Sequence, residues 1–345
     1  MAARGIPIRN IYYLLCYAWD RLEEAELTAV TPTPETQLPE LFARVLLSGV
    51  THLLKRGVNR AYVTTEDEIP GVRGRLDVTM SLKRATFPCA RAWCAFDELS
   101  ADTPANRILK TTLRQLAAVS EIDPRLADSL RDLYRRMPSV RETRITGQSF
   151  RRITLGSNTS YYGFLLDVCE IVHRNLLVDE STGKITFRDF TRDDAQMARL
   201  FERFLFRFYE REQAAYTVEA PHLEWHATGE AEALQFLPRM RTDIVLRNSE
   251  RTLVIDAKYY ADTLEEYFGK TSVRSKHMYQ IFAYLRHLAT ADGAKPVTGI
   301  LLYPRTTRSV SVQVKLFEHE FMAVTIDLAQ PWTGVREDLL AILVR

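Results

Sequence analysis

The sequence contains little of what would place a protein outside the cell or in a membrane. Its 4 cysteines are irregularly spaced, and Cys89 and Cys94 lack a second Cys/His pair at zinc-site spacing, which argues against a disulfide framework or a metal knuckle. No apolar run approaches the roughly 18 residues of a membrane helix, and no signal peptide is evident at the N-terminus. We therefore expect a cytoplasmic protein that makes no membrane contact.

An excess of charge of one sign is also missing. The 46 basic and 44 acidic residues leave a net charge of +2, so any nucleic-acid surface must be a local patch rather than a global field. The hydrophobic content of 46% is that of an ordinary globular protein, and 345 residues favour two domains. We find no internal repeat and no low-complexity tract.

The most informative stretch present is residues 242–260, TDIVLRNSERTLVIDAKYY. Two short apolar runs flank a polar turn, which predicts a β-hairpin. Asp243 opens the first strand, and Asp256 and Lys258 close the second. Strand side chains alternate, so Asp256 and Lys258 share a face, and pairing of the two strands can bring Asp243 beside them. The stretch therefore predicts two carboxylates and an ammonium group at one place.

This combination suits metal-dependent hydrolysis of a phosphodiester. Mg²⁺ prefers oxygen ligands and commonly uses one or two carboxylates together with water and phosphate oxygens. We predict Asp243 and Asp256 as the metal ligands and Lys258 as a catalytic group, following the D…(D/E)-x-K pattern of PD-(D/E)XK nucleases with twelve residues between the acids. The alternative is a solvated strand end. Asp256 directly follows an apolar run, however, and a carboxylate at the end of a buried strand usually has a function.

Two predicted helices supply further candidates for the catalytic site. Gln280 and Tyr284 lie four apart on one helical face and resemble the Q-x-x-x-Y motif of the RecB-like branch of these nucleases. The alternative is a core helix with a polar edge. Glu202 lies on the amphipathic helix 198–213, where members of this branch often place a glutamate near the metal. Its alternative is a surface charge.

A basic loop is predicted between the hairpin and the Gln280 helix, over residues 267–277. It carries Lys270, Arg274 and Lys276, which we expect to contact DNA phosphates, with a mobile solvated loop as the alternative. Its Gly-Lys-Thr sequence lacks the upstream glycine and the preceding strand of a phosphate-binding loop. We therefore expect that this chain binds no nucleotide.

The N-terminal half is predicted to be mostly helical. Asn10 is the expected cap of a first helix, and Thr103 and Pro104 are expected to begin another. Between them, residues 62–82 change to a strand pattern that projects a Gly-Val-Arg-Gly-Arg loop. Its Arg73 and Arg75 are candidates for contact with a partner or with phosphate, against the alternative of a solvated loop. We expect a partner-binding domain over residues 1–155 and a nuclease domain over residues 156–345.

Three segments in this order resemble the McrC family: IRNIYYLL, FDEL…TPANRILK and TDIVL…VIDAKYY…YQIFAYL. The resemblance implies a mixed α/β chain with a mostly helical N-terminal domain, a projecting β-hairpin region and a C-terminal PD-(D/E)XK restriction-endonuclease-like domain. It implies that Asp243, Asp256 and Lys258 are the cutting triad, with Gln280 and Tyr284 as the downstream motif. It further implies an McrB-like AAA+ GTPase hexamer as partner, double-stranded DNA containing methylated cytosine as substrate, and Mg²⁺ as cofactor.

Three functions remain open at this point. The first is a Mg²⁺-dependent endonuclease subunit that acts with a GTPase ring and stimulates it. The second is a self-sufficient RecB-like nuclease, which would cut without partner or GTP. The third is a non-catalytic subunit that activates a ring NTPase through an inert nuclease fold. Replacement of Asp256 separates the first two from the third, because an inert fold has no cleavage to lose.

Overall fold

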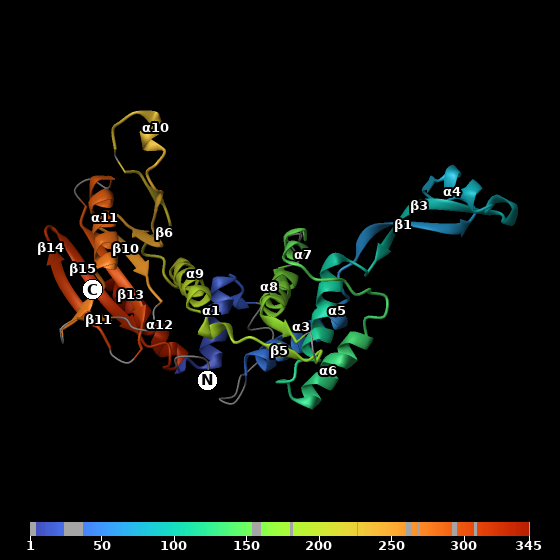
Figure 1. Ribbon diagram of the computed structural model, residues 1–345, viewed down its shortest axis with the longest axis horizontal. Helices are drawn as coiled ribbons and strands as arrows, with labels where there is room; N and C mark the ends of the chain where they lie inside the picture. The colour runs from blue at the N-terminus through green and yellow to red at the C-terminus, as the bar shows by residue number, and fades with distance from the viewer. Residues whose placement is uncertain are drawn as a thin grey trace. The chain divides into compact units, whose positions relative to one another are not determined.

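The protein is described by a computed structural model that covers residues 5–23, 37–153, 160–179, 182–225, 227–259, 264–267, 270–291, 295–306 and 309–344. It has mixed helix and sheet, which confirms the predicted fold class (Figure 1). Two compact units are present, one formed by Met1–Ala25, Thr31–Leu38 and Asp189–Arg345, the other by Glu26–Val30 and Pro39–Arg188. Within the described ranges, no helix combines the length and apolarity needed to cross a membrane.

The first unit is built on a six-stranded mixed sheet. Its strands run in the order β14 (Ser311–Leu316), β15 (His319–Ile326), β13 (Val297–Pro304), β10 (Thr252–Ala257), β9 (Ile244–Arg247) and β6 (Thr217–Glu219). β10 and β15 are each parallel to β13, and the other neighbours are antiparallel. β14 lies at the edge, as its alternating sequence predicts.

Helices α11 (Ser275–Ala291) and α9 (Asp194–Glu212) flank this sheet. Val254 of β10 is buried in one core with Ile281 and Leu285 of α11, which places α11 on the face that Val254 points to. α9 also packs against β10 and buries Phe201 and Leu205. Because side chains alternate along a strand, Asp256 shares the α11 face with Val254.

The predicted hairpin at residues 242–260 is confirmed. β9 and β10 pair with Leu246 opposite Leu253 and Ile244 opposite Ile255. The turn is closed by Asn248, whose Oδ1 accepts hydrogen bonds from the backbone N–H groups of Glu250 at 2.9 Å and Arg251 at 2.8 Å. The turn residues thereby fix the register, and the register decides which residues meet at the open end of the hairpin.

The N-terminal helix α1 (Ile8–Ala18) belongs to the same unit as the sheet. Pro7 precedes the helix, so the prediction of Asn10 as its cap is wrong. Asn10 is instead buried and donates to the carbonyls of Leu328 and Gln330, each at 2.8 Å. Tyr13 stacks on Trp332 of α12 (Trp332–Ala341) at 4.7 Å between ring centroids. These contacts attach the start of the chain to its end.

The observed units therefore differ from the expected division between residues 155 and 156. Helix α1 packs on α9 rather than with the following helices, and α8 (Ser160–Asn175) packs on α5 (Pro104–Leu116) of the second unit. The second unit thus extends to Arg188. It also contains α3 (Leu38–Arg56), α6 (Pro124–Arg135), α7 (Gly147–Arg151) and the short pair β4 (Leu176–Val178) and β5 (Ile185–Phe187). Thr103 caps α5 as predicted.

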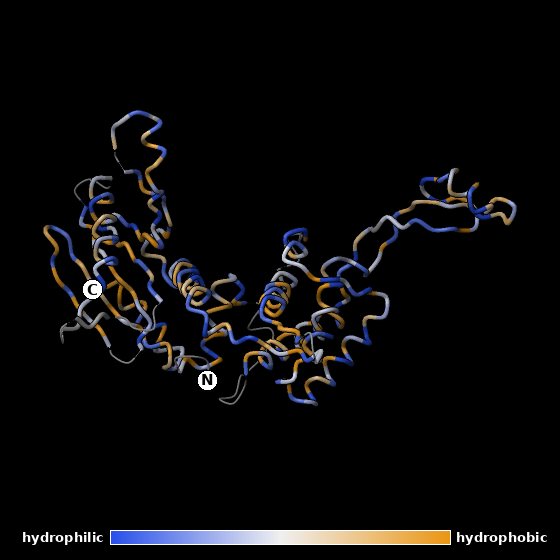
Figure 2. Tube along the Cα trace, in the orientation of Figure 1, coloured by the Kyte–Doolittle hydropathy of each residue, from blue (hydrophilic) through white to orange (hydrophobic). Residues whose placement is uncertain are grey.

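A β-structured arm, residues 61–100, projects from the helices of this second unit (Figure 1). β1 (Ala61–Pro70) and β3 (Arg91–Ser100) pair antiparallel along their whole length, and β2 (Arg75–Leu76) pairs with β3. Figure 2 shows β1 as mostly hydrophilic. The strand pattern predicted over residues 62–82 is broken by helix α4 (Val78–Lys83), because Asp77 caps it by accepting a hydrogen bond from Met80 N at 2.9 Å.

Candidate active site

The open end of the β9–β10 hairpin brings Asp243 and Asp256 together. Ile244 lies opposite Ile255 at the end of the ladder. Asp243 precedes Ile244 and Asp256 follows Ile255, so the two acids lie next to each other there. Asp243 Oδ2 accepts a hydrogen bond of 2.8 Å from Ala257 N, which fixes its carboxylate beside the end of β10. Asp256 is fully buried, with an exposed fraction of 0%.

Lys258 completes the group and lies on the same face as Asp256, as the strand alternation predicts. Its Nζ is 2.9 Å from Asp256 Oδ1 and 2.8 Å from Oδ2, but its direction suits a hydrogen bond to Oδ1. Asp256 Oδ2 is buried, and its contact with Lys258 is that of an ion pair rather than a well-directed hydrogen bond. The carboxyl groups of Asp256 and Asp243 are also close enough to interact directly.

Helix α11 supplies the other side of the site through Gln280 and Tyr284. Gln280 Oε1 accepts a hydrogen bond of 3.0 Å from Lys258 Nζ, and Gln280 Nε2 donates to Tyr284 OH at 2.7 Å. Tyr284 OH in turn donates to the carbonyl of Arg241 at 2.6 Å. One turn of helix therefore positions both the ammonium group and the chain segment that leads into Asp243.

The two carboxyl groups carry more negative charge than their surroundings compensate. Burial raises the pKa of Asp256 well above its usual range, and the neighbouring Asp243 adds to this shift, while Lys258 opposes it. Burial also raises the pKa of Asp243, again opposed by Lys258. Two buried acids facing one ammonium group make a place where a further cation is electrostatically favoured.

Glu202 lies on α9 close to this pair. Its Oε1 is 3.3 Å from an Nη of Arg241, and burial followed by the charge of Asp243 raises the pKa of Glu202. Across the described part of the chain, however, no three His, Cys, Asp or Glu side chains converge closely enough to hold one metal ion. The residues that fit a metal here are therefore two carboxylates, a number that suits Mg²⁺ with water and phosphate as its other ligands.

The predicted basic loop has more structure than expected. β11 (Leu264–Tyr267) and β12 (Lys270–Val273) pair antiparallel, and α11 begins at Ser275. The side chain of Lys270 lies outside the described residues. Arg274 is half-buried and Lys276 is exposed at the start of α11. His277 is buried beside Tyr303 OH at 3.0 Å, and burial with the nearby charge of Lys258 lowers the pKa of His277 to about 4.

Arg73 and Arg75 lie on the arm of the other unit and are both exposed. The guanidinium of Arg73 lies over the ring of Phe96 at 4.6 Å, and Arg75 is opposite Ala95 in the β2–β3 pair. Gly74 between them has φ +68 and its Cα faces the backbone of β3 at close range. The arm thus holds its two arginines in defined positions rather than on an unstructured loop.

Arg241 was not singled out from the sequence. It lies two residues before Asp243, and the same alternation that linked Asp256 to Lys258 could have drawn attention to it. Its side chain is 61% exposed, yet its charge lowers the pKa of both Asp243 and Glu202. The site therefore contains a second cation, which is more exposed than Lys258.

Comparisons with known proteins show the family of this chain. Residues 8–304 match the family model of the McrBC 5-methylcytosine restriction system component. The type IV methyl-directed restriction enzyme EcoKMcrBC of Escherichia coli (strain K12) is 33% identical over 338 residues, which cover 98% of this chain and 97% of that protein. A chain from the half-complex of the tetradecameric assembly of Thermococcus gammatolerans McrB AAA+ hexamers with bound McrC has a similar fold. It is 16% identical, with a TM-score of 0.59 over 96% of this chain and 75% of that one.

Proposed function

Because this chain belongs to the McrBC family of 5-methylcytosine restriction system components, we propose that it is the endonuclease subunit of a GTP-dependent complex that restricts DNA containing modified cytosine. The observation that carries the nuclease part is the meeting of Asp243, Asp256 and Lys258 at the open end of one hairpin. The methyl-directed restriction activity named for the 33% identical relative supports the choice of substrate.

Asp243 and Asp256 would hold the metal ion. The close approach of the two carboxyl groups at the hairpin end, and the raised pKa of both acids, fit a divalent cation in this place. When bound, Mg²⁺ supplies Lewis-acid polarisation of the phosphoryl oxygen and charge neutralisation. The protein's part is to present two carboxylate oxygens from a rigid strand end.

Lys258 acts on the phosphate and on the attacking water. Its ammonium group has three donors, of which the structure commits one to Asp256 and one to Gln280. The third is available to orient a water or to donate to the phosphoryl oxygen as negative charge develops there. Gln280 and Tyr284 hold this group in place from α11. Glu202 is proposed as an accessory carboxylate, because burial and the charge of Asp243 raise its pKa and so make it a stronger proton acceptor than an exposed glutamate.

DNA and partner contacts are assigned to separate regions. Lys270, Arg274 and Lys276 flank the site at the β11–β12 ladder and the start of α11, and would contact phosphates. Arg73 and Arg75 on the arm would contact an McrB-like AAA+ GTPase hexamer. Since the chain would bind no nucleotide, GTP hydrolysis would belong to that partner, which would also recognise the methylated cytosine.

Reconstitution tests this proposal. The chain is combined with an McrB-like AAA+ GTPase and given methylated or unmethylated plasmid, with and without GTP and Mg²⁺. We expect cleavage of methylated plasmid that requires the chain, the GTPase, GTP and Mg²⁺ together. Cleavage by the chain alone would instead identify a self-sufficient nuclease. GTPase stimulation with no cleavage under any condition would identify a non-catalytic activator.

A further inference from the structure

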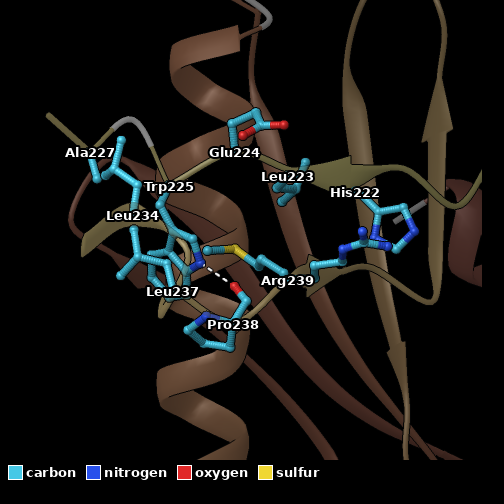
Figure 3. A pocket seen from close by; sticks show the side chains of 10 residues that line it. His222, Leu223, Glu224, Trp225, Ala227, Leu234, Leu237, Pro238 and Arg239 are labelled. Carbon is cyan, nitrogen blue, oxygen red and sulfur yellow. Dashed lines mark hydrogen bonds between the residues drawn. The ribbon is translucent and has the colours of Figure 1, made fainter. Parts of the chain in front are cut away.

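A groove of about 490 Å³ lies beside the active site in the same unit. It is formed where β7 (His222–Leu223) pairs with β8 (Met240–Arg241), with the short helix α10 (Ala231–Leu234) in the segment between them (Figure 1). Figure 3 shows an apolar part, with Trp225, Leu234, Leu237 and Pro238, and a basic end with His222 and Arg239. Met240 also lines the groove. The groove has no assigned role in the proposed reaction.

The apolar part of the groove is firmly held, although it faces solvent. Trp225 Nε1 donates a hydrogen bond of 2.5 Å to the carbonyl of Pro238, which fixes the plane of the indole (Figure 3). The ring of Trp225 is perpendicular to the ring of His287 on α11, with 5.8 Å between the ring centroids and an interplanar angle of 90°. Trp225 and Leu237 nevertheless remain 40% and 41% exposed. A rigid, exposed aromatic face of this kind suits the stacking of a flat ring.

The basic end of the groove continues directly into the active site. His222 lies opposite Arg241 in the β7–β8 pair, and Arg239 is two residues earlier on the same segment. Asp243 lies three residues after Met240, so at ~3.3 Å per residue the two lie at most about 10 Å apart along the chain. That is the length of about three base steps of B-DNA at ~3.4 Å each. A DNA strand whose phosphate lies at Asp243 and Asp256 would therefore reach the groove.

We propose that this groove binds one nucleotide of the DNA strand within about three steps of the cleaved phosphodiester. The base lies against Trp225, and its phosphate lies at the basic end, on Arg239 and Arg241. Glu224 lies on the Trp225 side of Leu223, where it repels phosphate and so favours the orientation with the phosphate at the basic end (Figure 3). The inference rests on the proposed nuclease function and extends it to the binding of the substrate strand.

Arg241 has a defined part in this scheme. In the free protein an Nη of Arg241 lies 3.3 Å from Oε1 of Glu202. The side chain of Arg241 is 61% exposed and that of Glu202 is 33% exposed. An exposed ion pair of this kind is weak, about 0–1 kcal/mol, so a phosphate can replace Glu202 as the partner of Arg241. A protein segment rich in apolar side chains would fill the apolar part but would leave Arg239 at the basic end without an acidic partner, which is why the observations favour DNA.

Photo-cross-linking provides the direct test. The full chain, assembled with its GTPase, is mixed with a methylated duplex containing 5-bromodeoxyuridine, with Ca²⁺ in place of Mg²⁺ to prevent cutting. The peptides cross-linked on irradiation are then identified. We expect a cross-linked peptide that contains Trp225. Trp225→Ala and Arg239→Gln should each raise the KM for DNA about tenfold, as expected for one lost base stack or phosphate contact, with kcat little changed. Trp225→Phe should keep most of the affinity.

Matched controls separate this effect from general surface changes. Phe236→Ala removes an aromatic residue that is 89% exposed and does not line the groove, and Arg203→Gln removes an exposed charge next to Glu202. Both should leave KM unchanged. Thermal unfolding of Trp225→Ala and Trp225→Phe shows whether the unit remains folded, and Trp225→Phe keeps the test valid if Trp225→Ala unfolds.

Two results would overturn the inference. One is wild-type KM in both Trp225→Ala and Arg239→Gln with no cross-link in residues 222–241. The other is unchanged cross-linking together with loss of assembly with the GTPase in Trp225→Ala, which would assign the groove to a protein segment. Failure of the nuclease proposal itself gives a different result, because then Asp256→Asn would still cut DNA whatever the groove variants do.

Discussion

Lys258 and Gln280 are joined by a hydrogen bond of 3.0 Å between Nζ and Oε1. Lys258 directly follows the central strand β10 and Gln280 lies in the second turn of α11, so this bond couples the end of the strand to the helix at the proposed active site. It also holds the ammonium group against Asp256. The position of Lys258 therefore depends on a side chain that lies more than twenty residues further along the chain.

Gln280→Ala should lower kcat for cleavage by about 10-fold to 100-fold with little change in the KM for DNA, as expected for a residue that orients a catalytic group. Steady-state kinetics of the reconstituted complex measures both constants. Thr290→Ala is the control, since Thr290 is exposed on the same helix and bonds only locally, to Arg286 O at 3.0 Å. If KM rose by the same factor while kcat stayed unchanged, Gln280 would bind DNA instead of positioning Lys258.

Lys258→Met should lower kcat by about 10²-fold to 10³-fold, because it removes the donor that stabilises charge developing on the phosphate. Folding should be retained, since Asp256 can take up a proton in place of its ion pair. Lys315→Met, an exposed lysine on edge strand β14 of the same sheet, is the control and should cut normally. Wild-type cleavage by Lys258→Met would remove this residue from the mechanism.

The central hairpin and the Gln280 helix were predictable because their signals are local. A polar turn between two β-branched runs fixes the register of β9 and β10, and four-residue spacing fixes the shared face of Gln280 and Tyr284. Asn10 was misassigned because its partners, the carbonyls of Leu328 and Gln330, lie at the other end of the chain. The local sequence does not distinguish an asparagine that caps a helix from one that hydrogen-bonds to a distant part of the chain.

Other features depended on tertiary pairing that no local pattern carries. The segment 267–277 was expected to be a loop, yet part of it pairs as β11 and β12. Strand β15 and helix α12 were not predicted at all, nor was the break at Pro221 that separates β6 from β7. Pro221 cannot donate a ladder hydrogen bond, which explains the break. The groove beside β7 and β8 follows from this break and was therefore also missed.

Gly74→Ala should damage the end of the arm, whereas Gly71→Ala should be tolerated better. Both glycines have positive φ, +68 and +75, which costs an alanine about 1 kcal/mol. Only at Gly74 would the added Cβ also meet neighbours, at 2.4 Å from Ala95 O and 2.8 Å from Phe96 Cβ. Gly74→Ala should therefore weaken GTPase stimulation and speed hydrogen exchange at β2 and β3, with Gly71→Ala as the control. Equal effects of the two would contradict the assigned role of this β2–β3 contact.

Asp102→Asn should destabilise the second unit by about 2 kcal/mol near neutral pH, because a charged hydrogen-bond acceptor is lost. Asp102 accepts from Arg107 Nε and Nη2, each at 2.7 Å, and from Arg141 N at 2.9 Å. The Arg107 hydrogen bond holds the pKa of Asp102 well below its usual range. The carboxylate thus contributes stability above its unfolded pKa of about 3.9, and this contribution is lost as pH falls below that value.

Urea unfolding between pH 7 and pH 3 measures this difference. The advantage of wild type over Asp102→Asn should be constant down to about pH 4 and shrink below it. Asp128→Asn removes a carboxylate that is 72% exposed and pairs only with the nearby Arg131, so it should change stability by less than about 0.5 kcal/mol. A pH-independent difference for Asp102→Asn would mean that the ion pair contributes nothing to folding.

The most direct test of the account is cleavage of methylated plasmid by the reconstituted complex that carries Asp256→Asn. The substitution keeps the size of the side chain but removes the charge that would hold the metal beside Lys258. We predict that cleavage falls below detection while stimulation of the partner's GTP hydrolysis stays at the wild-type level, with Asp128→Asn as the unaffected control. Cleavage at the wild-type rate by Asp256→Asn would show that the hairpin end is not where DNA is cut.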